Sequence, residues 1–133
     1  GMIGGQVIDI QAQSGSSAMD LHTLELMHIK KTGALIRAAA EGSAILCGAT
    51  LPQQTEAREF GQKLGLAFQI RDDLIEVDEG KLEGWSYPGT VGLQEAKSYL
   101  EKITNRCLQI ADGWGARAEV LRNLVQFNHR RNS

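Results

Sequence analysis

Four polar residues between positions 69 and 76 have the types and spacing of a metal-binding helix face. They are Gln69, Asp72, Asp73 and Glu76. On a helix they fall within an arc of about 100°. Several carboxylates without soft donors suit Mg²⁺, which usually retains water and bridges to substrate phosphates. Two or three carboxylates are too few to enclose a metal alone, so the pattern predicts a Mg²⁺ site completed by a phosphorylated substrate.

The same residues also fit a solvated acidic face near a helix end. The eight residues from Asp72 to Glu79 hold five acidic side chains and no basic one. Asp72 and Glu76 carry like charge one turn apart, which costs about 0.2–0.5 kcal/mol in a helix. Charge patterning alone does not separate the metal site from the solvated face, and both interpretations stay open at this point.

The segment Lys30–Gly33 is a second candidate for binding phosphate. It is not the end of a Walker loop, because His28 and Ile29 stand where glycines would precede it. A lysine and a hydroxyl at a helix start can still bind phosphate, together with free backbone N–H groups. On their own, Lys31 and Thr32 are typical of a solvated surface. Combined with the acidic face, they favour a diphosphate site.

Length and charge bound the class of protein. The 133 residues suffice for one domain with a real core, and the net charge is −2 without a basic block. This argues against nucleic acid or an anionic membrane as the main partner, and no apolar run is long enough to span a membrane. Cys47 and Cys107 stand alone on apolar stripes, so we expect core residues and a reducing, cytoplasmic location.

The elements that must position these residues are helices. Apolar residues recur at helical spacing, and period-two alternation is nearly absent. The pattern predicts an all-α helical bundle, with a turn-rich gap between Asp78 and Thr90. The expected helices cover about 2–12, 20–46 and 53–77, then 93–110 and 120–125, with Gly113 and Gly115 between the last two.

Four segments occur together in one order along the chain: Gly4–Gln6, Lys31–Ala38, Gly65–Asp73 and Tyr87–Pro88. With them the chain resembles the C-terminal part of a trans-polyprenyl diphosphate synthase, closest to the bacterial farnesyl diphosphate synthases. The resemblance covers nearly all of residues 1–133. It implies the all-α isoprenoid-synthase fold, Mg²⁺ dependence and a homodimer.

The resemblance also implies a reaction, the head-to-tail condensation of an allylic diphosphate with isopentenyl diphosphate. In such enzymes Mg²⁺ and cationic side chains draw negative charge from the allylic diphosphate, which leaves as pyrophosphate. The double bond of isopentenyl diphosphate attacks the resulting carbocation, and a proton is then lost.

Roles for individual residues follow from the resemblance by position. Asp72 is similar to the metal-binding aspartate of the family's second aspartate-rich motif. Asp73 and Glu76 are expected to support it through water.

The substrate-binding roles come from the same resemblance. Lys31 is expected to contact the allylic diphosphate, and Thr32 and Gln69 to flank the reacting carbon with their oxygens. Phe68 would pack beside the chain pocket. Gln6 resembles a glutamine that lines the same cavity.

The chain departs from the family pattern at three places. Glu76 stands where the motif has aspartate, and the loop after it is short, with Trp85 near the position of an expected lysine. The first aspartate-rich motif and the basic residues that hold isopentenyl diphosphate are absent from these 133 residues. We therefore expect this chain to be inactive unless it associates with the missing N-terminal half.

Three alternative functions remain open. A non-catalytic partner subunit would explain Glu76, Trp85 and the short loop. A plain helical dimerisation module would leave the acidic residues merely solvated and predicts no Mg²⁺-dependent binding of diphosphate. Terpene cyclisation on the same fold explains Lys31 and Thr32 poorly.

Overall fold

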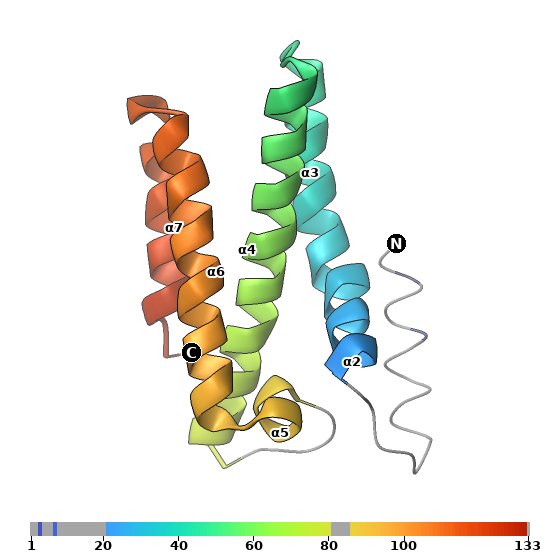
Figure 1. Ribbon diagram of the computed structural model, residues 1–133, viewed down its shortest axis with the longest axis vertical. Helices are drawn as coiled ribbons and strands as arrows, with labels where there is room; N and C mark the ends of the chain where they lie inside the picture. Colours follow the sequence, from blue (N-terminus) through green and yellow to red (C-terminus); the bar gives the residue numbers. More distant parts are fainter. Residues whose placement is uncertain (1–2, 4–6, 8–20, 81–85, 133) are drawn as a thin grey trace.

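The computed structural model describes residues 3, 7, 21–80 and 86–132. Within this part every element is helical, which confirms the predicted all-α class (Figure 1). None of the described helices is both long and apolar enough to cross a membrane. The elements are α2 (Leu21–His28), the π-helical turn η1 (Ile29–Gly33), α3 (Ala34–Leu46), α4 (Leu51–Asp78), α5 (Tyr87–Val91), α6 (Leu93–Gly113), the 3₁₀ turn η2 (Ala116–Ala118) and α7 (Glu119–Arg130).

The long helix α4 lies at the centre of the bundle. Figure 1 shows α3 along one side of it, α6 and α7 along the other, and α5 near its C-terminal end. Its buried residues run from Ala57 through Ile70 to Ile75. A helix that is apolar on more than one face has to be covered by more than one neighbour, which explains this central position.

Local signals set both ends of α4. The Thr50 backbone N–H donates to Gln53 Oε1 (2.9 Å), and Thr50 Oγ1 accepts in return from the Gln53 backbone N–H, forming a capping box. Pro52 occupies the first turn, where its missing N–H has no cost. The helix therefore begins slightly before the predicted residue 53. After Asp78 the chain reaches Gly80 at φ +69°, a conformation that terminates helices.

Two apolar clusters hold the helices together. Full burial of one Leu, Ile or Val side chain contributes about 1.5–3 kcal/mol, so these clusters are the main source of stability. The first cluster fixes the half of α4 that carries the acidic run. It contains Met27, Leu66, Ala67, Ile70, Leu74, Tyr87, Ala96, Leu100 and Ile103. The second joins α4 to α6, η2 and α7 and contains Phe60, Leu64, Cys107, Ile110, Ala111, Ala118 and Val125.

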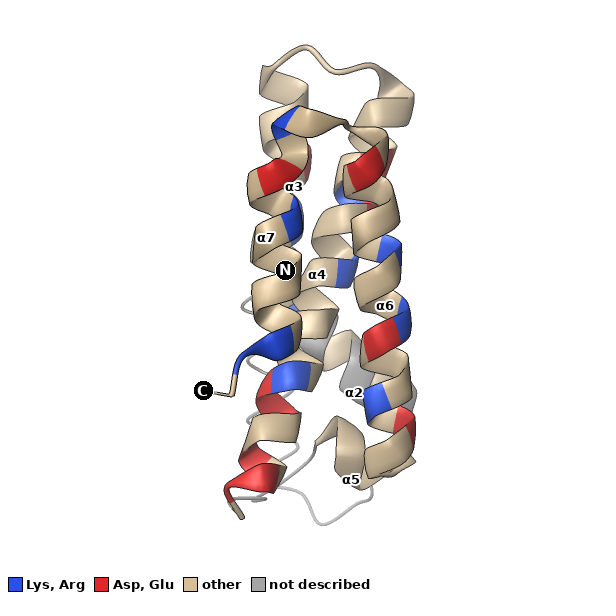
Figure 2. Cartoon of the chain, turned by 90° about the vertical axis from the view of Figure 1, so that its left-hand side faces the viewer, with Lys and Arg blue, Asp and Glu red and all other residues tan. Residues whose placement is uncertain are grey.

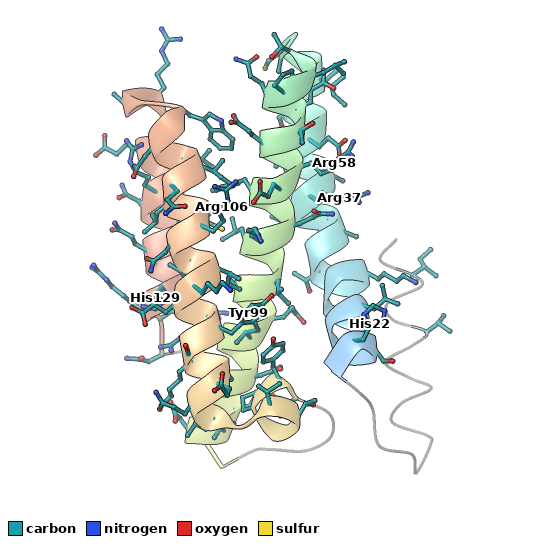
Figure 3. All side chains as sticks on the ribbon, viewed as in Figure 1. His22, Arg37, Arg58, Tyr99, Arg106 and His129 are labelled. Atoms are coloured by element: carbon teal, nitrogen blue, oxygen red, sulfur yellow. The ribbon has the colours of Figure 1, made fainter. Side chains whose placement is uncertain are left out.

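Polar contacts reinforce the packing of α6 on α4. Figure 3 shows Arg106 and Tyr99 on α6, on the side of α4. The Arg106 guanidinium donates to both carboxylate oxygens of Glu59, at 2.7 and 2.9 Å. This contact holds the pKa of Glu59 below its usual range. Tyr99 stacks on Tyr87 with ring centroids 5.5 Å apart, which ties α6 to α5.

The structure corrects two expectations about local structure. The predicted gap contains α5, because Ser86 Oγ accepts from the Gly89 N–H (3.1 Å) and Pro88 occupies the first turn. The prediction for the cysteines is correct only in part. Cys107 is buried, which raises its pKa to about 12, whereas Cys47 is exposed after α3 and is not a core residue. Most of the helix expected at 2–12 lies outside the described residues.

Candidate functional site

A close contact between two glycines places the two candidate segments side by side. A Cβ added to Gly65 in α4 would lie 2.5 Å from the Cα of Gly33 in η1. Real Cβ atoms essentially never lie this close to another atom, so the two backbones can approach here only because Gly65 has no side chain. The crossing fixes η1 against α4 at one point. Neighbouring residues on the two elements are therefore brought into contact.

Thr32 and Gln69 meet beside this crossing. The side-chain amide of Gln69 donates from Nε2 to Thr32 Oγ1 at 2.9 Å, although the residues are 37 positions apart. Both side chains are half-buried. Because the NH₂ group faces Thr32, the amide oxygen lies at the opposite corner of the group. The pair thus combines a fixed hydroxyl and a fixed amide oxygen, which can stabilise positive charge nearby.

The Lys30–Gly33 segment does not lie at a helix start, and this expectation was wrong. It belongs to a π-helical turn inside a helical stretch that runs from Leu21 to Leu46. In a π-helix the backbone N–H groups bond to carbonyls within the helix, so free backbone donors for phosphate are not supplied here. Single π-helical turns are frequent at functional sites. The Lys31 backbone lies in this turn, and its side chain, like Gln6, lies outside the described part of the chain.

The acidic residues at the end of α4 have different surroundings. Asp73 is buried, with 9% of its surface exposed, and its Oδ2 accepts from the backbone N–H of Tyr87 at 2.7 Å. This carboxylate caps the start of α5. Asp72 is partly exposed and pairs with Arg131, and Glu76 is exposed one turn later. The three carboxylates therefore do not form a single set of ligands.

The described residues contain no group of three acidic, histidine or cysteine side chains able to hold a metal ion by themselves. The acidic run nevertheless gathers at the lower end of α4 in Figure 2. Asp72 is partly exposed there and Glu76 is exposed. Any ion at this end would take most of its ligands from water and from a substrate.

Arg131 and Arg71 also lie at the candidate site, and the sequence did not predict them. Arg131 follows α7, yet its guanidinium reaches Asp72 and lies 4.1 Å from the centroid of the Phe68 ring. Arg71 donates from Nε to the Arg131 backbone carbonyl at 2.7 Å. Phe68, expected beside a chain pocket, therefore lies beneath Arg131. No local pattern pairs residues this far apart, so only the tertiary structure reveals them.

A family model described as "Polyprenyl synthetase" matches residues 1–83. Among curated proteins, "Geranylgeranyl pyrophosphate synthase, chloroplastic" from Capsicum annuum is 33% identical over 129 residues. The match covers 88% of this chain and 35% of that protein. The chain thus spans about a third of the length of this relative.

Two solved structures resemble the fold closely. An FPP/GFPP synthase from Zymomonas mobilis in its apo form gives a TM-score of 0.89 at 29% identity, covering 96% of this chain and 45% of that one. A geranyltransferase from Helicobacter pylori complexed with magnesium and isoprenyl diphosphate gives a TM-score of 0.74 at 25% identity, covering 96% and 45%. These likenesses confirm the predicted isoprenoid-synthase type of fold.

Proposed function

Because the chain belongs to the polyprenyl synthetase family, we propose that residues 1–133 are the C-terminal part of a trans-polyprenyl diphosphate synthase of the farnesyl or geranyl type. The complete protein would condense an allylic diphosphate with isopentenyl diphosphate. The observation that carries this proposal is the hydrogen bond between the Gln69 amide and the Thr32 hydroxyl. Gln69 lies on α4 about one turn before Asp72, and Thr32 lies in η1. It gives two residues with predicted roles in the reaction a shared position beside the acidic run.

Mg²⁺ is the proposed cofactor, and the donors at the end of α4 fit this ion. The partly exposed carboxylate of Asp72 would bind it directly, and the exposed Glu76 would act through water. Asp73 would support the site from behind, because it fixes Tyr87 to the end of α4. When bound, the ion supplies positive charge that stabilises the diphosphate leaving group.

The remaining roles belong to residues around the glycine crossing. Lys31 would contact the allylic diphosphate from η1. Thr32 and Gln69, held together by their hydrogen bond, would place their oxygens beside the carbon that becomes positively charged. Phe68 and Gln6 would line the pocket for the hydrocarbon chain.

An apolar groove that the described residues leave open supports association with further helices. The groove has a volume of about 660 Å³ and lies between α3, α4 and α7. Its lining includes Ile36, Phe60, Leu121 and Leu124, and Leu124 keeps 47% of its surface exposed. We assign the groove to the N-terminal half of the family fold, with a homodimer as the expected assembly.

Both cysteines of the chain are free thiols, Cys47 exposed and Cys107 buried. Free thiols are typical of a reducing compartment, which supports a cytoplasmic location.

A non-catalytic partner subunit is the second candidate function. Glu76 in place of the family's aspartate favours it, because the longer side chain changes the geometry of the metal site. Trp85, near the position of an expected lysine, also favours it but lies outside the described residues. This candidate predicts association with a synthase without a contribution from Asp72 to the reaction.

A condensation assay separates the two candidates. The chain would be tested alone and together with the N-terminal half of the Zymomonas mobilis synthase, after light scattering has confirmed that the two pieces associate. We expect no product from the chain alone and Mg²⁺-dependent product from the assembly. Asp72→Asn should lower kcat about 10²–10³-fold, while Asp78→Asn, an exposed acid on the same helix, should leave it unchanged. If the pieces associate but Asp72→Asn leaves the kcat of the assembly unchanged, the result would favour the partner subunit.

A further inference from the structure

The residues that follow α7 fold back against the acidic end of α4. Figure 2 shows the C-terminus beside this part of the helix. Arg71 donates from Nε to the backbone carbonyl of Arg131 (2.7 Å) and from Nη2 to Asn132 Oδ1 (3.2 Å). The backbone of Arg131 is extended, with φ −61° and ψ 146°, so the chain leaves the helix here and turns toward α4. Arg71 thus anchors the segment through its backbone.

The side chain of Arg131 contacts several groups on α4 and α7. It forms an ion pair with Asp72 Oδ1, and its Nη2 also donates to the Phe68 carbonyl at 3.2 Å. Its Nε donates to Oδ1 of the buried Asn128 at 2.9 Å, and its guanidinium lies over the Phe68 ring. Only 10% of the side chain is exposed. A guanidinium fixed in this way is a positioned charge and not a mobile surface group.

The Arg131 guanidinium is paired with the Asp72 carboxylate, which is the proposed metal ligand. A cation bound at Asp72 Oδ1 competes with a metal ion for the same oxygen, and it repels any divalent ion that approaches the other oxygen. A diphosphate arriving with the metal offers the guanidinium a second partner, because arginine binds phosphate oxygens as readily as carboxylates. The contact between Arg131 and Asp72 therefore opposes binding of the metal alone, but opposes binding of the metal together with diphosphate less.

We propose that Arg131 is the resident counter-ion of Asp72, which keeps the affinity for free Mg²⁺ low and is displaced when metal and diphosphate arrive together. This inference rests on the proposed function, because it takes Asp72 as the metal ligand. Arg131 is a positioning residue in this scheme. It would make metal binding depend on the presence of substrate.

Mn²⁺ binding to the full chain tests the inference, with electron paramagnetic resonance reporting the free ion. Arg131→Gln should bind Mn²⁺ alone roughly three- to tenfold more tightly than wild type, the range expected when the counter-charge of one partly exposed carboxylate is removed. Arg130→Gln is the matched control, since it removes the same charge from the adjacent, exposed position and should change the affinity less than about twofold. Arg71→Gln, which releases the backbone anchor, should act in the same direction as Arg131→Gln and more weakly.

Inorganic pyrophosphate supplies the second half of the test. With pyrophosphate present, the difference between wild type and Arg131→Gln should shrink or reverse. If Arg131→Gln and Arg71→Gln both match Arg130→Gln with Mn²⁺ alone, Arg131 does not control the site and the inference is wrong. Weaker binding by Arg131→Gln would overturn it as well. The variant Asp72→Asn tests the proposed metal site separately from the inference about Arg131. Loss of Mn²⁺ binding in Asp72→Asn would support the site whatever the result for Arg131→Gln, whereas unchanged binding in Asp72→Asn would refute the site itself.

Discussion

The Gln69 side-chain amide donates a hydrogen bond to the Thr32 hydroxyl over 2.9 Å, joining α4 to the π-helical turn that precedes α3. Thr32 adjoins Gly33, and Gln69 follows Gly65 by one helical turn; a Cβ added to Gly65 would lie 2.5 Å from the Gly33 Cα. The hydrogen bond and the close backbone approach therefore join the same two elements. Thr32 and Gly33 of one segment and Gly65 and Gln69 of the other thus form one unit. The proposed chemistry uses its two polar residues, Thr32 and Gln69.

Removing the hydroxyl of this unit should lower both stability and activity. Thr32→Val leaves the Gln69 amide without its partner in a half-buried place, and we expect a loss of about 0.5–1.5 kcal/mol in the free energy of unfolding, measured by urea denaturation. Thr55→Val is the control, because Thr55 bonds only to the Leu51 carbonyl on the exposed side of α4 and should cost less than about 0.5 kcal/mol. Equal losses for the two variants would contradict the role of the Thr32–Gln69 bond.

The glycine crossing makes a second prediction. Gly65→Ala would place a methyl group 2.5 Å from the Gly33 Cα, so η1 must move away from α4. We expect destabilisation of about 1–3 kcal/mol, the usual cost of overpacking. Gly42→Ala, in α3 with open space around the added Cβ, should instead stabilise the chain by up to about 1 kcal/mol through helix propensity. A neutral Gly65→Ala in thermal unfolding would show that the crossing is not tight.

Asp72 and Asp73 are adjacent, but substitution of Asp73 should mainly lower stability and substitution of Asp72 should mainly abolish metal binding. Asp73→Ala removes a buried carboxylate that accepts the Tyr87 N–H, and we expect a loss of about 1.5–3 kcal/mol in the free energy of unfolding. Asp72→Ala breaks a partly exposed ion pair and should cost at most about 1 kcal/mol, while abolishing metal binding. The two free energies come from urea denaturation. If Asp72→Ala proved the more destabilising variant, the division of roles would be reversed.

The contact between Glu59 and Arg106 predicts a dependence of stability on pH. The folded pKa of Glu59 lies below its ordinary value of 4.5, because Arg106 hydrogen-bonds the carboxylate. The ion pair therefore stabilises the fold above that value, and the contribution is lost as the pH falls through the folded pKa. Arg106→Gln should be less stable than wild type at neutral pH, by less than about 1 kcal/mol, and the difference should vanish once the pH has fallen below the folded pKa of Glu59.

Lys102→Gln removes a charge from the exposed side of the same helix and serves as the control. Its difference from wild type should change little over the same pH range. An Arg106→Gln difference that persisted at low pH would mean that Glu59 is not its source.

The sequence predicted the helices well because apolar periodicity is local information. The apolar stripe through Phe60 and Leu74 lies within a single helix, and α4 agrees with the prediction to within a few residues. The helix α5 was missed because its cap, Ser86, and its anchor, Asp73, act on only five residues. A helix this short carries too little periodicity to be seen in a sequence.

The site could be predicted only as far as its segments. Residue types and resemblance pointed to Thr32, Gln69 and Asp72, and the structure shows that the first two meet. The π-helical turn and the partner of Asp72 were not foreseen. Arg131 lies 59 residues after Asp72, and such a contact depends on how α7 packs against the bundle, which no local pattern encodes.

Calorimetric titration of geranyl diphosphate into the full chain, with and without Mg²⁺, would show whether Asp72 takes part in a diphosphate site. We expect saturable binding at one site per chain that requires Mg²⁺ and is lost in Asp72→Asn but kept in Asp78→Asn. Asp72→Asn must first be shown by circular dichroism to keep its helical structure. Binding that is absent in the folded wild type, or that persists without Mg²⁺ and without the Asp72 carboxylate, would contradict a diphosphate site at the end of α4.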